Sequence, residues 1–341
     1  MLKKPVKKNR WTVGDLVVIA IIFYLLGILT ILFLFSLNND HSNQAYPLND
    51  WIETSSNGPK PRTVLEQKSS NRVQNVESPS LSKTKQYHLW EATTVIRSAL
   101  YQYVKKYNNM PKDLSKLHQP FPNNFLSALP KDPIFYSNRV YKTFTGTGGW
   151  VYQPQKISSH ESLSQVIKQS IIPNIEGKTL DIPFYPMEMK IIQDKHELWV
   201  VSGDVILRRY PIGLGKNNRT PTGTFYIDIK IMNPNQHQYS IKQNPYGKRA
   251  LQLSISNYAI HGTNQAESIG RNISNGCIRM FNEDIVELYS LIPLYTSVHI
   301  QMNYSLSTNG HQKKIYHPFP LYSQKDNVKE EDQSRVYNWL H

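Results

Sequence analysis

The chain has 341 residues, with 39 Lys and Arg against 25 Asp and Glu, so its formal net charge is +14. This length allows about two domains, and the charge favours a place beside an anionic partner such as nucleic acid, a membrane surface or a cell wall. The sequence contains no nucleic-acid-binding module, and apart from one N-terminal cluster its basic residues are spread along the chain. We therefore exclude nucleic acid as a partner.

Residues 16–37, LVVIAIIFYLLGILTILFLFSL, contain no charged side chain. At about 1.5 Å per residue they predict one transmembrane helix across a hydrocarbon core of roughly 30 Å. The basic segment 1–15 precedes them, so the positive-inside rule places the N-terminus in the cytoplasm and the rest of the chain outside the cell, facing the wall. A cleaved signal peptide would have a shorter apolar core followed by an A-x-A site, which is absent.

Residues 38–85 are rich in Ser, Asn, Lys and Pro, which predicts a linker, since such a segment cannot bury enough apolar surface to fold. From 86 to 107 apolar residues recur at steps of three and four, the pattern of an amphipathic helix that Asn108, Asn109 and Pro111 would end. Prolines and short aromatic runs follow, closing with GTGGWVYQP at 146–154. Residues 86–155 are thus predicted to form a small α+β domain.

This helix, LPKDP at 129–133 and GTGGWVY at 146–152 resemble the soluble part of type IV pilins and secretion pseudopilins over about 70 residues. Those proteins carry a Gly-Phe-type processing site and a glutamate just inside the apolar helix, and this chain has neither. We therefore expect a spacer or partner-docking role and not a fibre subunit. An unrelated small α+β unit remains the alternative.

Residues 187–302 have a different pattern, which predicts closely spaced strands and a single helix. The stretch 187–215 alternates apolar and polar residues between turn signals, which predicts a meander. Thr220 to Gly223 fit a type I turn that leads into a strand, and the helix is expected to begin near Asn282 as its N-cap. Further strands are predicted at 251–255, 258–260 and 297–301.

Cys277 is the only cysteine of the chain, so it is either a small buried residue or a nucleophile. It follows Gly276 in a polar segment, 16 positions after His261. A cation that lowers the thiol pKa and a base that accepts its proton activate such a residue, and Arg279 and His261 are the candidates. The alternative for His261 is a core histidine at the end of a strand, where Gly262 lets another backbone approach closely. The alternative for Arg279 is a structural ion pair with Glu283 or Asp284.

The stretches HGTN, SIG and SNGCIRM, with YPIGLGK and RTPTGTF upstream, resemble the signatures of the YkuD family of L,D-transpeptidases over residues 187–302. The resemblance implies a mainly β catalytic domain, a YkuD-like β-sandwich or barrel with one helix after the cysteine loop. It implies that Cys277 is the nucleophile and His261 its base. Ser274-Asn275-Gly276-Cys277 departs from the common Ser-His-Gly-Cys, but a change at Asn275 leaves the base in place and bears on hydrogen bonding or substrate preference.

The implied reaction forms a thioester with a peptidoglycan stem peptide, releases D-alanine and crosslinks a neighbouring stem. Amides near Gly276 and Cys277 would hold the oxyanion, and Arg279 would pair with a substrate carboxylate or stabilise the thiolate. Thr263 and Ser274 would hydrogen-bond the loop or the imidazole. Carbapenem-type inhibitors are expected to acylate Cys277.

The sequence also allows other readings of this domain. Water in place of the amine gives an L,D-carboxypeptidase, and a non-catalytic wall-binding or pilus-associated protein could keep the same fold. A zinc enzyme is disfavoured because HExxH is absent and the histidines show no ligand-like pairing, so no metal or cofactor is expected. Residues 303–341 extend past the domain, and the sequence assigns them no role.

Overall fold

The computed structural model describes residues 81–157, 160–177, 180–240, 242–303, 330–331 and 335–339. All of them belong to one compact unit, Gln74–His341. The predicted transmembrane helix at 16–37 and nearly all of the predicted linker lie outside the described residues. Among the helices that are described, none combines the length and the apolar character needed to cross a membrane.

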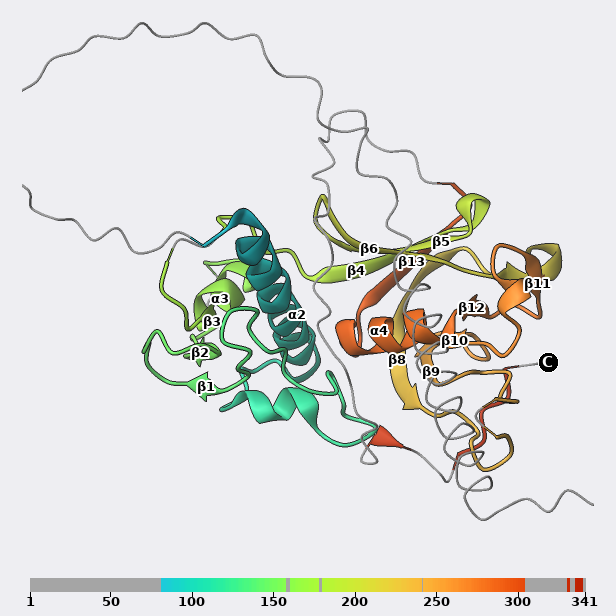
Figure 1. Ribbon diagram of the computed structural model, residues 1–341, viewed down its shortest axis with the longest axis horizontal. Helices are drawn as coiled ribbons and strands as arrows, with labels where there is room; N and C mark the ends of the chain where they lie inside the picture. The colour runs from blue at the N-terminus through green and yellow to red at the C-terminus, as the bar shows by residue number, and fades with distance from the viewer. Residues whose placement is uncertain are drawn as a thin grey trace, which may run out of the picture. The chain divides into compact units, whose positions relative to one another are not determined.

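The N-terminal part of this unit, residues 83–173, is called the small lobe here and consists of helices and short strands (Figure 1). A three-stranded sheet in the order β1-β2-β3 lies beside the long helix α2. The elements are α2 (Lys83–Tyr107), η3 (Leu114–His118), β1 (Val140–Tyr141), β2 (Trp150–Tyr152), α3 (Leu163–Ser170) and β3 (Ile171–Pro173). The stretch 86–155 contains helices and short strands, and β2 lies in GTGGWVY. That this stretch is a separate domain stays a prediction.

Helix α2 begins and ends where its sequence provides caps. The Ser82 hydroxyl accepts a hydrogen bond from the Lys85 amide, and Asn108 ends the helix in the left-handed conformation, with φ of 54°. The predicted end is confirmed, but the start takes in the last residues of the predicted linker. Because 15 of its 25 residues are buried, the helix is covered on more than the one face that an amphipathic pattern predicts.

Helix α3 lies in the stretch 156–186, for which no element was predicted. Its signal is a capping box: the Ser162 hydroxyl accepts a hydrogen bond from the Gln165 amide, while the Gln165 side chain accepts one from the Ser162 amide. The helix is followed at once by β3, which pairs with β2 and completes the small sheet.

Residues 187–301, called the large lobe here, form an eight-stranded mixed sheet in the order β12-β10-β9-β8-β13-β4-β5-β6. Its strands are β4 (Met187–Ile192), β5 (Glu197–Ser202), β6 (Val205–Pro211), β8 (Gly223–Met232), β9 (Arg249–Leu253), β10 (Ala259–Gly262), β12 (Ile278–Met280) and β13 (Ser297–Gln301). Strands β7 (Leu214–Gly215) and β11 (Asn272–Ser274) form a separate parallel pair, and the short turns of helix are η4 (Gln193–Lys195), η5 (Lys216–Asn218) and η6 (Ala266–Ser268). Helix α4 (Asn282–Leu291) packs on β9 and β10.

The predicted mainly β domain with one α-helix after the cysteine is confirmed. Strand β13 has the predicted bounds, and the 187–215 meander appears as β4, β5 and β6 with antiparallel pairing. Two neighbouring pairs, β10 with β12 and β13 with β4, are parallel. The first of these pairs places the segment after His261 beside the segment after Cys277.

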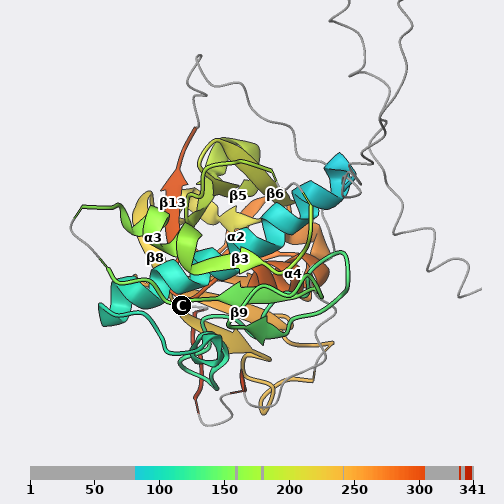
Figure 2. The ribbon, with the colours of Figure 1, turned by 90° about the vertical axis from the view of Figure 1, so that its left-hand side faces the viewer.

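Helix α2 of the small lobe lies across the strands of the large lobe (Figure 2). The two lobes share one hydrophobic core and are joined by buried polar contacts. Arg208 of β6 lies 2.6 Å from the Glu91 carboxylate of α2 and 2.7 Å from Glu287 of α4. The Met187 amide donates to the Ser98 hydroxyl at 3.0 Å. Buried residues of the small lobe therefore fix it to the large sheet.

Candidate active site

The cysteine sits at the end of a tight turn that its own side chains hold closed. The Ser274 hydroxyl accepts a hydrogen bond from the Gly276 amide at 3.1 Å and donates one to the Cys277 carbonyl at 2.7 Å. Gly276 has φ of 143°, and a Cβ there would lie 2.7 Å from a ring carbon of Tyr258. Only glycine fits this position, and Ser274 serves the loop, one of the two roles predicted for it.

The upstream signature reaches the same turn through Thr220. Its hydroxyl donates to the Gly276 carbonyl at 2.9 Å and accepts from the Gly215 amide at 2.8 Å. A Cβ on Gly215 would lie 2.8 Å from the Gly276 Cα, so the two backbones touch. The sequence marked RTPTGTF as a signature but did not show that Thr220 supports the cysteine turn.

His261 lies on β10, next to the strand that Cys277 leads into. The parallel register pairs Ile260 with Ile278 and His261 with Arg279. The imidazole Nδ1 lies 2.6 Å from the Gly262 carbonyl, and because a carbonyl can only accept, Nδ1 carries the hydrogen. Nε2 is then the nitrogen free to act as a base.

Burial lowers the pKa of His261 to about 4, an effect that the Arg279 charge reinforces and the bond to Gly262 opposes. The imidazole is therefore neutral at physiological pH. A neutral ring with Nδ1 already donating is the form that can take a proton from a thiol.

The loop after His261 is held by a close backbone approach and by Asn282. A Cβ on Gly262 would lie 2.4 Å from Asn282 Oδ1 and 3.1 Å from the Gly247 Cα, which confirms the close approach predicted at Gly262. The side chain of Asn282 donates from Nδ2 to the Thr263 carbonyl at 2.9 Å and accepts at Oδ1 from the backbone amide of Lys248 at 3.0 Å. The expectation that Asn282 caps α4 is wrong: Phe281 is the cap residue, without a side-chain bond.

Thr263 and Arg279 are engaged within the loop. The Thr263 hydroxyl accepts from the Gln265 amide at 3.0 Å, which is the loop role and not the imidazole role of the two predicted. Arg279 is half-buried and donates to the Gln265 side chain at 2.8 Å, while Glu283, one of its predicted ion-pair partners, lies 3.9 Å from Lys248. Asn275 is half-buried beside the cysteine.

Cys277 itself is buried, with 3% of its surface exposed. Its sulfur lies 3.8 Å from the Asn257 carbonyl and 3.7 Å from the Trp339 carbonyl. Burial raises the pKa of the thiol to about 11, against a backbone hydrogen bond of Ala259 and the Arg279 charge, which both lower it. The expectation that a nearby cation would lower the pKa overall is wrong, because desolvation outweighs Arg279.

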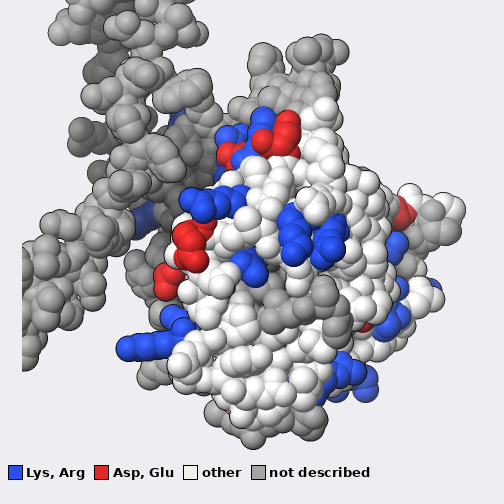
Figure 3. Space-filling model, turned by 90° about the vertical axis from the view of Figure 1, so that its right-hand side faces the viewer, with Lys and Arg blue, Asp and Glu red and all other residues white. Residues whose placement is uncertain are grey.

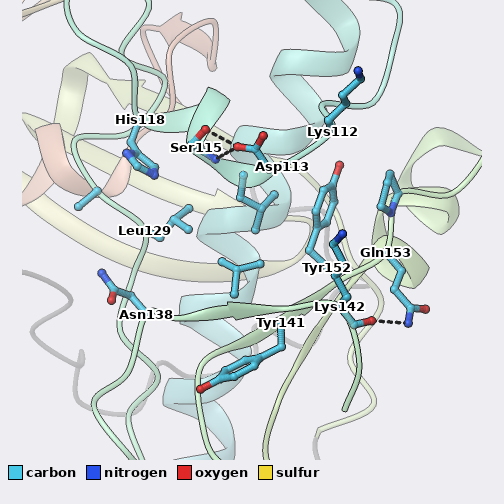
Figure 4. A pocket seen from close by; sticks show the side chains of 14 residues that line it. Lys112, Asp113, Ser115, His118, Leu129, Asn138, Tyr141, Lys142, Tyr152 and Gln153 are labelled. Atoms are coloured by element: carbon cyan, nitrogen blue, oxygen red, sulfur yellow. Dashed lines mark hydrogen bonds between the residues drawn. The ribbon is translucent and has the colours of Figure 1, made fainter. Parts of the chain in front are cut away.

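A cavity of about 730 Å³ lies elsewhere, in the small lobe between η3 and β1–β2 (Figure 4). Lys112, His118, Tyr141, Lys142 and Tyr152 are among its lining residues, and no residue of the cysteine turn or of β10 takes part. The candidate active site is thus marked by its side chains and not by this hollow.

Comparison with known proteins agrees with this arrangement. The profile of the YkuD family, described as the L,D-transpeptidase catalytic domain, matches residues 189–300. The YkuD protein of Bacillus subtilis is 45% identical over 96 residues, which is 28% of this chain and 54% of that protein. The YkuD protein of Bacillus licheniformis is 38% identical over 131 residues, covering 38% of this chain and 72% of that protein.

An L,D-transpeptidase structure from Mycobacterium smegmatis aligns with 34% of this chain and 58% of its own, at 22% identity and a TM-score of 0.28. The chain spans about half the length of the Bacillus subtilis relative, 54%, and most of the Bacillus licheniformis one, 72%. On the strength of these two relatives and of the matched domain, the chain belongs to the YkuD family of L,D-transpeptidases.

Proposed function

We propose that this protein is a membrane-anchored L,D-transpeptidase that crosslinks peptidoglycan stem peptides. The observation that carries the proposal is the placement of His261 and Cys277 at adjacent parallel strands, inside the domain that matches the family. The neutral imidazole and the turn held by Ser274 and Thr220 provide a base and a fixed nucleophile.

The first half of the reaction acylates the enzyme. The Cys277 thiol gives its proton to Nε2 of His261 as its sulfur attacks the carbonyl of the third stem residue. Amides of the Gly276–Cys277 turn hold the oxyanion, a type of contact worth about 2.7–4 kcal/mol in the transition state. The bond to D-alanine breaks, the departing amine takes the proton from His261, and a thioester remains on Cys277.

The second half transfers the acyl group. An amine of a neighbouring stem attacks the thioester carbonyl and gives its proton to His261. The carbon–sulfur bond breaks, and the Cys277 thiolate takes that proton back. The product is an amide between two third-position residues. Water in place of the amine gives carboxypeptidase chemistry with the same residues.

The predicted helix at 16–37 would hold the enzyme on the outer face of the membrane, with the linker and the small lobe between the bilayer and the site. Basic side chains are spread over the face drawn in Figure 3, and acidic side chains gather mainly near one edge of it. A basic surface suits an anionic wall. Protease shaving of intact cells tests this placement, since the chain after residue 38 should be cut.

The activity is tested by mass spectrometry of products after mixing the full-length protein in detergent with a purified disaccharide-tetrapeptide. Wild type should release D-alanine and form a dimer, and Cys277→Ala should do neither. A monomer shortened by D-alanine, without dimer, would identify a carboxypeptidase. Unchanged substrate with folded wild type, over several stem types, would favour a wall-binding or pilus-associated protein.

A further inference from the structure

The C-terminal residues return to the large lobe and are fixed there by three successive contacts. The first is Glu330, which is 1% exposed. Its carboxylate accepts hydrogen bonds from the Tyr289 hydroxyl at 2.8 Å and the Ser127 hydroxyl at 2.9 Å, and Asn124 donates at 3.4 Å. Ser127 and Asn124 belong to the small lobe and Tyr289 to α4, so one carboxylate joins the tail to both lobes.

The second contact lies beside the end of β8. Glu331 forms a parallel bridge with Met232, the last residue of that strand. Its carboxylate accepts from the side-chain amides of Asn233 at 2.6 Å and Gln236 at 3.1 Å. Glu331 thus lies alongside the last residue of β8.

The third contact is a pair of hydrogen bonds to the backbone of Tyr337. The Asn235 side chain donates to the Tyr337 carbonyl at 2.6 Å and accepts from the Tyr337 amide at 2.8 Å. Exposure alternates along this stretch, with Val336 and Asn338 exposed and Tyr337 and Trp339 buried. An extended peptide is bound in the same way when both of its main-chain polar groups are bonded and alternate side chains point inward.

Trp339 completes the segment above the two proposed catalytic residues. Its ring stacks on His261, with centroids 6.0 Å apart and planes at 18°, and meets Tyr246 edge-on at 5.1 Å. Its carbonyl oxygen lies 3.7 Å from the Cys277 sulfur. With Trp339 in place, His261 is 1% exposed and Cys277 is 3% exposed.

We propose that residues 330–331 and 335–339 form an autoinhibitory strap that occupies the acyl-donor position in the manner of an extended peptide, with Trp339 closing access to Cys277 and His261. The regulatory consequence rests on the proposed function. A stem peptide must bring its carbonyl against the Cys277 sulfur, where the Trp339 carbonyl now lies, so the strap and the donor exclude each other.

The protein is therefore divided between a closed and an open population. The apparent Kd for the donor equals the Kd of the open state divided by the fraction of molecules that are open. Only the last residues need to lift, because Glu330 and Glu331 anchor the segment elsewhere. Lifting Trp339 also returns water to the thiol, which reduces the desolvation that raises the pKa of Cys277. Access and thiolate content then increase together.

The test measures how fast iodoacetamide alkylates Cys277 in the full-length protein, a reading that does not depend on catalysis. Trp339→Ala should raise the rate at pH 7 by about tenfold or more, the change expected if the closed state is favoured by on the order of ten to one. Val336→Ala, at a position 54% exposed in the same segment, is the matched control and should leave the rate unchanged.

Truncation after residue 329 should raise the rate at least as much, and circular dichroism checks that the variant is folded. Folded Trp339→Ala protein that is alkylated at the wild-type rate would overturn the strap. The failure of the proposed function gives a different result: faster alkylation in Trp339→Ala with no product from the tetrapeptide in any variant.

Discussion

The Thr220 hydroxyl donates a 2.9 Å hydrogen bond to the Gly276 carbonyl, so the upstream signature directly supports the turn that carries the nucleophile. The same oxygen accepts from the Gly215 amide. Both groups are buried, and each would lose its partner if the hydroxyl were removed.

Thr220→Val keeps the shape of the side chain and removes this oxygen. We expect it to lower the free energy of unfolding by about 1–3 kcal/mol and to lower kcat, because the Gly276–Cys277 amides are no longer fixed. Thr220→Ser should retain most of both. Urea unfolding and initial rates compare the two variants, and a Thr220→Val protein with wild-type stability and kcat would mean that the hydroxyl does not support the turn.

Gly276→Ala places a Cβ 2.7 Å from the Tyr258 ring in a conformation with φ of 143°. We expect a loss of about 1–3 kcal/mol in stability and a large loss of activity, since the turn must move. Gly270→Ala is the control: it also has positive φ, 77°, but its Cβ would meet nothing within 4 Å. Equal activity losses in both variants would assign the effect to the backbone conformation alone.

The pH dependence follows from His261. Because burial lowers its pKa to about 4, the neutral base persists as pH falls, and kcat/KM in the wild type should decline only near that value. In Trp339→Ala the ring is less buried, so the acid limb should move up towards 6.5. A wild-type limb already at 6.5, unchanged in the variant, would contradict the burial of the imidazole.

The joint between the lobes depends on a buried charge. Glu91→Gln removes the carboxylate charge that lies 2.6 Å from Arg208 and leaves Glu287 to balance the guanidinium, and we expect a loss of about 3–5 kcal/mol in stability. Asp181→Asn, which breaks an ion pair exposed to solvent with Lys168, should change stability by less than about 1 kcal/mol. Thermal unfolding of both variants compares them, and similar losses would mean that the buried pair is not what joins the lobes.

The sequence predicted the parts of the site that are local in the chain. The His-Gly and Gly-Cys pairs stand in recognisable signatures, and the meander shows its period of two, so Cys277, His261 and the β-rich lobe could be foreseen. The capping box of Ser162 and Gln165 was also readable, although it was missed. The pilin resemblance of the small lobe stays a prediction.

What could not be predicted depends on contacts between distant residues. Trp339 lies 62 positions from Cys277, and nothing around it in the sequence marks it as a cover for a thiol. The same holds for the buried pair of Arg208 with Glu91, whose residues look like ordinary surface charges. The predicted direction of the Cys277 pKa shift was wrong for the same reason. The sequence shows that Arg279 is near, but the burial that raises the pKa is set by the fold.

Trapping the acyl-enzyme tests most directly whether Cys277 is the nucleophile. Full-length protein is mixed with disaccharide-tetrapeptide, quenched in acid and digested, and the peptide that contains Cys277 is weighed. We expect an adduct of the disaccharide-tripeptide on Cys277 in wild type, with D-alanine released in step, and more of this adduct in Trp339→Ala. Carbapenem should label the same residue. Release of D-alanine without this adduct, and equally from Cys277→Ala, would contradict the assignment of Cys277 as the nucleophile.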